Sequence, residues 1–264
     1  MTSGAALAAL AEPPSCPHVS EGTTGWVHSW DISTGVDGPG TRLVVFLSGC
    51  PLRCLYCHNP DTWRRAAGGQ ETPVSDVERL ISRYKPFIAA SGGGLTVSGG
   101  EPLQQAAFTR RLMQAGRAAG LHTALDTSGF LGRRADTALL DATDLVLLDI
   151  KSGTDAGHRR ITGRPLGPTL EFARRLADRG DRAWVRYVLV PGYTDQPAEL
   201  DAFIAIVAGL PNVERVEILP FHTLGQSKYE RLGIAFPLAQ TPPPSPELVR
   251  AVRERMLAGG LPAV

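Results

Sequence analysis

Cysteine is scarce in this chain: only four cysteines occur among 264 residues, and three of them stand within eight residues of one another. Four thiols placed in this way do not make the disulfide framework of a secreted protein of this length. The scarcity indicates a reducing compartment, and we expect a cytoplasmic protein.

An excess of charge of one sign is also missing. The 27 Lys and Arg side chains nearly balance the 26 Asp and Glu side chains, which leaves a formal net charge of +1. Without a basic run or patch in the sequence, nucleic acid is not expected as a partner. No apolar run approaches the roughly 20 residues needed to cross a bilayer, so we expect no membrane span.

The N-terminal stretch "MTSGAALAALAEPPSC" is apolar but lacks two features of a signal peptide. No Lys or Arg precedes its apolar part, and Glu12-Pro13-Pro14 interrupts it. We therefore expect residues 1–24 to form a disordered extension. No repeat or break in composition divides the rest, so residues 25–264 are expected to form one domain.

Short runs rich in Val, Leu and Ile alternate with segments of helical periodicity, which predicts strands joined by helices. The expected strands are residues 43–47, 95–97, 122–125, 145–148, 184–189 and 216–219. Six such repeats favour a parallel α/β sheet, either an open doubly wound sheet or a partial (β/α)6 barrel.

Local signals predict where the helices begin and end. Ser75 to Glu78 matches a capping box, and Thr169 is expected to cap a helix that ends at Gly180. Gly120 is expected to end another helix. Pro197, and Pro246 after Ser245, suit the first turns of two more.

Polar residues follow the expected strands at one end. They are the cysteines after the first strand, Ser98 to Pro102 ("SGGEP") after the second, Asp126 and Thr127 after the third, Asp149 and Lys151 after the fourth, Arg186 within the fifth and His222 after the sixth. Taken singly, Asp126 suits a turn, and Lys151 and His222 suit solvated loops. However, the carboxyl ends of parallel strands meet on one face, where ligands bind. Independent turn residues have no reason to select that face, so we predict one shared site.

Three clustered cysteines, Cys50, Cys54 and Cys57, are compatible with several chemistries. Residues 54–58 match a haem attachment pattern, but haem leaves Cys50 unused and needs an export route. Zinc could bind three thiolates and His58, although the adjacent Cys57 and His58 would have to reach one ion. A disulfide exchange site would use two cysteines only. A [4Fe–4S] cluster held by three thiolates uses all of them and leaves one iron open to another ligand.

The spacing Cys50-x₃-Cys54-x₂-Cys57 after the first strand, with SGGEP after the second, resembles the radical S-adenosylmethionine (SAM) superfamily. The stretches "GVDGPGTR", "CLYCHNPDTW", "SGGGLTVSGGEPL", "LDTSGF", "LLDIKS", "VRYVLVPGYTD" and "ILPFHTLGQSKY" resemble the glycyl radical enzyme activases within it. The resemblance runs from about Trp26 to the C-terminus. Residues 59–94 hold no cysteine, whereas other activases often carry an extra cluster insert there, and this favours the pyruvate formate-lyase branch.

The resemblance implies a role for particular residues of this chain. Cys50, Cys54 and Cys57 would bind the cluster. The residues near SAM would be Tyr56, His58, Asn59, Gly99, Gly100, Glu101, Asp149, Ile150, Lys151 and His222. A monovalent alkali cation would be held by Asp126, Thr127, Asp149 and the Leu147 carbonyl, which are the hard oxygen ligands that such a cation prefers. Asp37 and Arg186 would contact the substrate loop, although Asp37-Gly38-Pro39-Gly40 alone equally suits a turn.

The resemblance also implies the reaction of an oxidoreductase. An electron from the cluster would split SAM, and the resulting 5′-deoxyadenosyl radical would take a hydrogen atom from a glycine Cα of pyruvate formate-lyase. No residue is expected to act as a catalytic acid or base. Flavodoxin or ferredoxin would supply the electron, and the enzyme would be a monomer. The alternatives are an activase of another glycyl radical enzyme, a radical enzyme acting on a small molecule, or, outside this class, a zinc-stabilised binding module.

Two features depart from the family pattern. Cys16 lies in the extension and has no expected role. Phe221 stands where a tyrosine is expected, which removes one hydroxyl group near the site.

Overall fold

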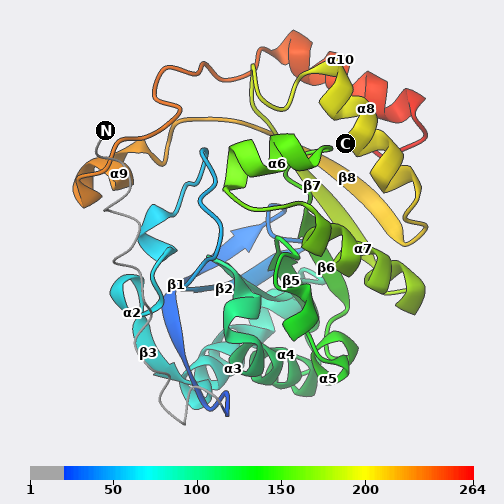
Figure 1. Ribbon diagram of the computed structural model, residues 1–264. Coiled ribbons are helices and arrows are strands. Elements are labelled where there is room, and N and C mark those ends of the chain that lie inside the picture. Colours follow the sequence, from blue (N-terminus) through cyan, green and yellow to red (C-terminus); the bar gives the residue numbers. More distant parts are fainter. Residues whose placement is uncertain (1–20) are drawn as a thin grey trace.

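The computed structural model describes residues 21–264 (Figure 1). Cys16 and residues 1–20 of the expected extension lie outside the described residues. Residues 21–24, which the sequence assigned to the same extension, are placed with the fold. The Glu21 carbonyl accepts a hydrogen bond from Arg111 Nε at 3.1 Å, and Thr24 opens the first strand.

The chain forms one eight-stranded sheet, in which neighbouring strands follow the order β3-β1-β2-β4-β5-β6-β7-β8. The strands are β1 (Thr24–Thr34), β2 (Thr41–Leu47), β3 (Gln70–Pro73), β4 (Gly94–Gly99), β5 (His122–Thr127), β6 (Leu145–Asp149), β7 (Ala183–Leu189) and β8 (Val213–Pro220). Neighbours from β2 to β8 are parallel. The parallel, open sheet confirms the expected α/β class and the partial-barrel form.

The sheet is larger than the sequence predicted, because β1 and β3 extend one edge as antiparallel strands. Polar residues occupy much of β1, and β3 has only four residues, mostly exposed. Neither strand therefore carries the buried apolar run by which the parallel strands were recognised.

Helices connect the parallel strands and cover the outer face of the sheet (Figure 1). The helices are α2 (Arg65–Gly68), α3 (Val74–Ala90), α4 (Ala106–Ala118), α5 (Thr137–Asp141), α6 (Asp155–Thr162), α7 (Gly167–Arg179), α8 (Pro197–Ala208), α9 (Gln226–Leu232) and α10 (Pro246–Ala258), with 3₁₀ turns η1 (Pro60–Thr62), η2 (Pro102–Gln105) and η3 (Gly132–Arg134). Alternation along each strand places side chains such as Leu43, Val45 and Leu148 in the core with Phe172 of α7. The intervening side chains face the inner, concave side of the sheet, and several of them are polar.

Two helix caps predicted from the sequence are wrong. Helix α3 begins at Val74 after Pro73, so Ser75 lies inside its first turn, and no side chain caps that end. Helix α7 begins at Gly167, and the Thr169 hydroxyl instead donates to the Ser128 carbonyl at 2.9 Å. The Thr169 side chain, which the local sequence predicted to cap the helix, makes a tertiary contact instead.

The other helix ends agree with the sequence. Gly180 ends α7 in the left-handed conformation, and Gly120 adopts a positive φ just after α4. Pro197 begins α8, and the Ser245 hydroxyl accepts from the Leu248 amide at 3.2 Å at the start of α10.

Candidate active site

The three clustered cysteines lie on the loop that follows β2. Helix α6 holds this loop in place, because the amides of Arg53 and Leu55 donate to the carbonyls of Thr162 and Ile161, both at 2.9 Å. Cys50, the first of the three, is tied to the following turn by its amide, which donates to the Trp63 carbonyl at 3.2 Å. The loop therefore has a fixed course in space that depends on a helix more than 100 residues further along the chain.

The thiols of this loop are in a poorly solvated environment. Burial raises the pKa of Cys54 to about 12, and burial also raises the pKa values of Cys50 and Cys57 above the ordinary value. Hydrogen bonds from the Leu52 amide to Cys50, and from the Asn59 amide and the Trp63 indole to Cys57, oppose this effect. Thiolates at these positions consequently need a positive partner such as iron, whose binding releases the thiol protons.

A cavity of about 480 Å³ opens beside the cysteine loop. The predicted site residues that line it are Cys50, Cys54, Tyr56, Cys57, His58, Asn59, Gly99, Gly100, Asp126, Thr127, Asp149, Lys151, Arg186 and His222. Four others, Asp37, Glu101, Leu147 and Ile150, are not part of its lining. The structure thus brings together most of the side chains that the strand-end argument selected.

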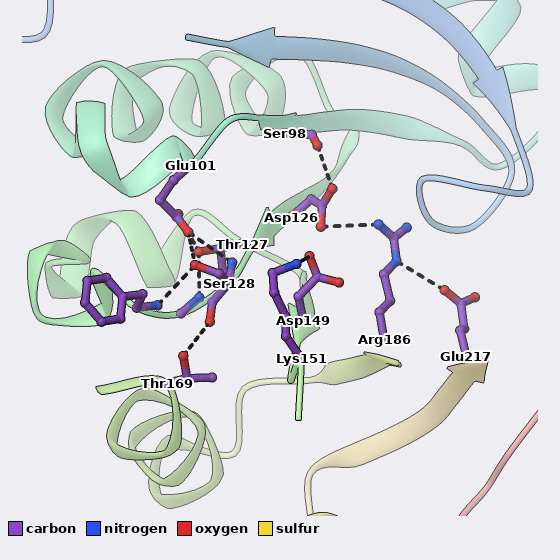
Figure 2. Close-up of polar contacts among 12 residues, drawn as sticks. Ser98, Glu101, Asp126, Thr127, Ser128, Asp149, Lys151, Thr169, Arg186 and Glu217 are labelled. Carbon is purple, nitrogen blue, oxygen red and sulfur yellow. Dashed lines mark hydrogen bonds and ion pairs between the residues drawn. The ribbon is translucent and has the colours of Figure 1, made fainter. Parts of the chain in front are cut away.

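Glu101 lies behind the cavity wall, fully buried. Its carboxylate accepts from the Leu103 amide at 3.1 Å, from the Thr127 hydroxyl at 2.6 Å, and from both the amide and the hydroxyl of Ser128 (Figure 2). These four donors occupy both oxygens. Glu101 therefore links the loop after β4 to the loop after β5, and its carboxylate has no free acceptor for a ligand in the cavity.

Gly99 and Gly100 have no room for a side chain, because the end of β2 and the start of the cysteine loop lie against them. A Cβ on Gly99 would lie 2.2 Å from the Leu47 amide nitrogen, and one on Gly100 would lie 2.5 Å from the Gly49 carbonyl oxygen. The resemblance implied only that these glycines lie near SAM. The structure adds a requirement from within the chain: only glycine lets the β4 loop pack against the end of β2.

Charged side chains form a chain across the inner face of the sheet (Figure 2). Asp126 Oδ2 accepts from the Ser98 hydroxyl at 2.5 Å, and Asp126 Oδ1 lies 3.2 Å from Arg186 Nη1. Arg186 also pairs with Glu217 at 3.3 Å. Burial raises the pKa of Asp126 to about 6, although the Arg186 guanidinium favours the carboxylate.

Asp149 and Lys151 form a second pair at the end of β6, with 3.0 Å between Lys151 Nζ and Asp149 Oδ2. Burial lowers the pKa of Lys151, but the neighbouring Asp149, Tyr56 and Cys54 outweigh this effect and hold it well above its ordinary value. A positively charged amine is thus fixed in the cavity wall near the second cysteine.

The candidate cation ligands are neighbours, but their side chains are not equally available. Leu147 is paired with Asp126 between β5 and β6. The Thr127 hydroxyl donates to Glu101 and accepts from the Gly129 amide at 3.0 Å. The Thr127 hydroxyl therefore has one acceptor position left, and it is held toward Glu101 and Gly129.

His58 and His222 come together although 164 residues separate them. Their rings stack with centroids 4.1 Å apart, and His58 Nε2 lies 3.1 Å from the His222 carbonyl oxygen. Lys228 on α9 secures the same loop: its ammonium donates to Asn59 Oδ1 at 2.7 Å and pairs with Asp61 at 3.0 Å. The sequence analysis did not predict a role for Lys228 or Asp61. For Lys228, the one available signal was its place in the "QSKY" stretch that resembles the family.

The loop between β1 and β2 lies against the inner face of the sheet. Thr96 on β4 donates to the Asp37 carbonyl at 2.7 Å, and Arg186 Nη2 donates to the Val36 carbonyl at 2.6 Å. Val36 lines the cavity, whereas the Asp37 side chain does not. The two residues predicted to contact a substrate, Asp37 and Arg186, therefore belong to one connected unit at the cavity.

The cysteine geometry fits a cluster better than a single ion. Among residues 21–264, no three His, Cys, Asp or Glu side chains converge on a point suited to one metal ion. Cys50, Cys54 and Cys57 instead border a common cavity. Soft thiolates are the ligands of iron–sulfur clusters.

Comparison with known proteins agrees with this geometry. The sequence profile of the Radical SAM superfamily matches residues 44–204. A pyruvate formate-lyase-activating enzyme from Staphylococcus aureus is 46% identical over 235 residues, which cover 86% of this chain and 93% of that protein. Two solved structures share the fold: a domain of pyruvate-formate lyase-activating enzyme from Bacteroides vulgatus (TM-score 0.53, 24% identity, 65% of this chain and 98% of that one) and a radical SAM methyltransferase from Sphaerobacter thermophilus (TM-score 0.60, 19% identity, 88% and 71%).

An open parallel sheet with three cysteines after its first parallel strand defines a radical SAM enzyme, whose cofactors are SAM and a [4Fe–4S] cluster. Within that superfamily, the chain belongs to the pyruvate formate-lyase-activating enzyme family. The zinc-stabilised binding module is thereby excluded. Across the described residues, no helix is long and apolar enough to cross a membrane.

Proposed function

We propose that this protein activates pyruvate formate-lyase by generating a glycyl radical on it. The observation that carries the proposal is that Cys50, Cys54 and Cys57 border the same cavity as Asp149, Lys151 and His222. Cys50, Cys54 and Cys57 would hold the [4Fe–4S] cluster, which would supply the electron for reductive cleavage of SAM and thereby the radical chemistry that removes a hydrogen atom from the target glycine.

The residues of this chain bind SAM and hold it in place. The backbones of Gly99 and Gly100 face the amino group of SAM, while Lys151 and Asp149 face its carboxylate and ribose. Tyr56 and His222 would lie near the adenine, with His58 and Asn59 beside them in the cavity lining, while Ile150 lies behind it. Glu101 acts indirectly, since its carboxylate fixes the two loops that carry these groups.

A monovalent cation would bind next to the SAM carboxylate. Asp126 and Asp149 supply carboxylate oxygens, and the carbonyls of Thr127 and Leu147 supply the others. The pairing of Asp126 with Leu147 supports their proximity, and the use of the Thr127 hydroxyl by Glu101 and Gly129 favours its carbonyl as the ligand.

The glycine-bearing loop of the target enzyme enters next to residues 35–40, where Asp37 and Arg186 receive it. The contacts of Arg186 with the Val36 carbonyl and with Asp126 support this, because they join the loop to the SAM side of the cavity. The electron comes from a flavodoxin or a ferredoxin, and the enzyme works as a cytoplasmic monomer.

The test mixes the anaerobically reconstituted, reduced protein with SAM and pyruvate formate-lyase and records electron paramagnetic resonance spectra. We expect the doublet of a glycyl radical, together with one 5′-deoxyadenosine for each radical formed. A Cys54→Ala variant is the matched control and should give neither product. Radical formation on a different glycyl radical enzyme, with none on pyruvate formate-lyase, would contradict the assigned partner while leaving the reaction class intact.

A further inference from the structure

A carboxylate from α8 binds the polar groups of the turn that follows Lys151. Glu199 Oε2 accepts from the Ser152 hydroxyl at 2.5 Å and from the Gly153 amide at 3.0 Å. Glu199 Oε1 accepts from the Thr154 hydroxyl. Three consecutive residues of the turn are therefore bound to one side chain that lies 45 to 47 residues further along the chain.

The turn also packs against α8 without room for a side chain. A Cβ on Gly153 would lie 2.2 Å from the Glu199 carbonyl oxygen and 2.4 Å from the Phe203 amide nitrogen. A Cβ on Gly157, in the first turn of α6, would lie 2.3 Å from Glu199 Oε1. Only glycine allows such a close approach, so both the shape of the turn and its hydrogen bonds depend on α8.

Lys151 stands between two fixed points of the backbone. On one side Asp149 ends β6 and is paired with Arg186 on β7, and on the other side Ser152 is bound to α8. Lys151 Nζ lies 3.0 Å from Asp149 Oδ2 and 5.7 Å from the centre of the Tyr56 ring, and all three residues line the cavity. The direction of the ammonium group therefore depends on the anchor at Ser152 as well as on the sheet.

We propose that Glu199 is a positioning residue for SAM: it holds Lys151 in the orientation that receives the SAM carboxylate. The inference rests on the proposed function, in which Lys151 faces that carboxylate. Glu199 is not part of the cavity lining, so its effect on a ligand has to pass through the turn. A lysine ammonium sits on a long, flexible stem, and a loosened backbone beneath it raises the entropic cost of holding it against a ligand.

The experiment measures ligand binding by equilibrium dialysis on the anaerobically reconstituted full chain, with the cluster oxidised so that SAM is not split. SAM is compared with 5′-methylthioadenosine, which keeps the adenine and the ribose but lacks the carboxylate. In Glu199→Gln one carboxylate oxygen becomes an amide NH₂ that faces the donors of the turn. We expect SAM to bind about tenfold more weakly, which is about 1.4 kcal/mol, and 5′-methylthioadenosine to bind within about twofold of the wild type.

Asp201 supplies the matched control. It lies on α8 two residues beyond Glu199, but it pairs with Arg255 of α10 at 2.6 Å. Asp201→Asn removes the same charge from the same helix without touching the turn, so we expect wild-type binding of both ligands.

A second variant approaches the same contact from the turn. Ser152→Ala removes one of the three side-chain and backbone donors to Glu199 and leaves the carboxylate in place. We expect it to weaken SAM binding by about threefold. This variant tests the inference even where Glu199→Gln loads little iron.

Unchanged SAM binding by a normally loaded Glu199→Gln or Ser152→Ala protein would overturn the inference. Equal losses for SAM and 5′-methylthioadenosine would overturn it as well, because they would indicate a general loosening of the cavity and not the positioning of Lys151. Failure of the proposed function has a different signature. A wild-type chain that binds and splits SAM but forms no radical on pyruvate formate-lyase would refute that function and leave the role of Glu199 intact.

Discussion

Glu101 illustrates how a buried side chain serves the site without touching its ligands. It is fully buried, and its two oxygens accept four hydrogen bonds from Leu103, Thr127 and Ser128. In Glu101→Gln one oxygen becomes an amide NH₂ that faces hydrogen-bond donors. We expect the free energy of unfolding to fall by about 1–3 kcal/mol, measured with urea on the loaded protein. Glu254→Gln, at an exposed position of α10, is the control, and equal stability of the two variants would contradict this role.

His158 predicts a dependence of stability on pH. It is fully buried on α6, with Nδ1 2.7 Å from the Arg164 carbonyl and no partner at Nε2. Burial lowers its pKa, because a proton at Nε2 would have no acceptor. A lowered folded-state pKa means that the stabilising contribution is complete above the unfolded value near 6.5 and is lost as the pH falls below it.

The measurement for His158 is the free energy of unfolding at about pH 7.5 and about pH 5.5. We expect the wild type to lose about 1 kcal/mol more than His158→Gln over this interval, since one pH unit corresponds to 1.36 kcal/mol for one group. An identical loss in the two proteins would mean that His158 titrates normally.

At the scale of secondary-structure elements, α9 holds the loop that follows the third cysteine. Lys228 reaches from α9 to Asn59 and Asp61, and Asp61 is also 3.0 Å from His28 on β1. Lys228→Met should free the loop that carries His58 and Asn59. We expect about fivefold weaker SAM binding by equilibrium dialysis, which corresponds to about 1 kcal/mol. Arg231→Met on the exposed side of the same helix should bind like the wild type, and a loss there of the same size would contradict the role of Lys228.

The parallel strands were predictable because buried apolar runs and strand-end polar residues are both visible in one sequence. The limits of β8 were off by three residues at its start, where Val213–Arg215 is only partly buried. Capping by Thr169 failed for a different reason: its hydroxyl bonds Ser128, which is 41 residues away. The contacts of Glu101, Lys228 and Glu199 were likewise out of reach, because each joins residues that become neighbours only after the sheet has formed.

At the scale of the whole molecule, one buried arginine connects several segments of the chain at the end of the sheet where the parallel strands begin. Arg42 on β2 is fully buried and donates to Thr96 at 2.5 Å, to the Leu95 carbonyl at 2.6 Å, and to the carbonyls of Pro39 and His122, both at 3.1 Å. Arg42→Met would leave these buried acceptors unpaired. We expect a loss of about 3 kcal/mol or more in the free energy of unfolding.

The control for Arg42 is Arg174→Met on the exposed face of α7. It removes an arginine of equal size that no buried acceptor needs, and should leave the urea midpoint within about 0.5 kcal/mol of the wild type. If Arg42→Met unfolded at the same urea concentration as this control, the buried network would carry no stability.

The six residues from Gly35 to Gly40 belong to no strand or helix, and Val36 among them lines the cavity. They are attached to the barrel by Thr96, Arg186 and Arg42 through backbone carbonyls alone. These attachments do not depend on the side chains of Val36, Asp37 and Pro39, whereas Gly35, Gly38 and Gly40 have positive φ values that favour glycine. Substitutions that leave the course of this loop unchanged are therefore expected at Val36, Asp37 and Pro39, and of these three only Val36 borders the cavity.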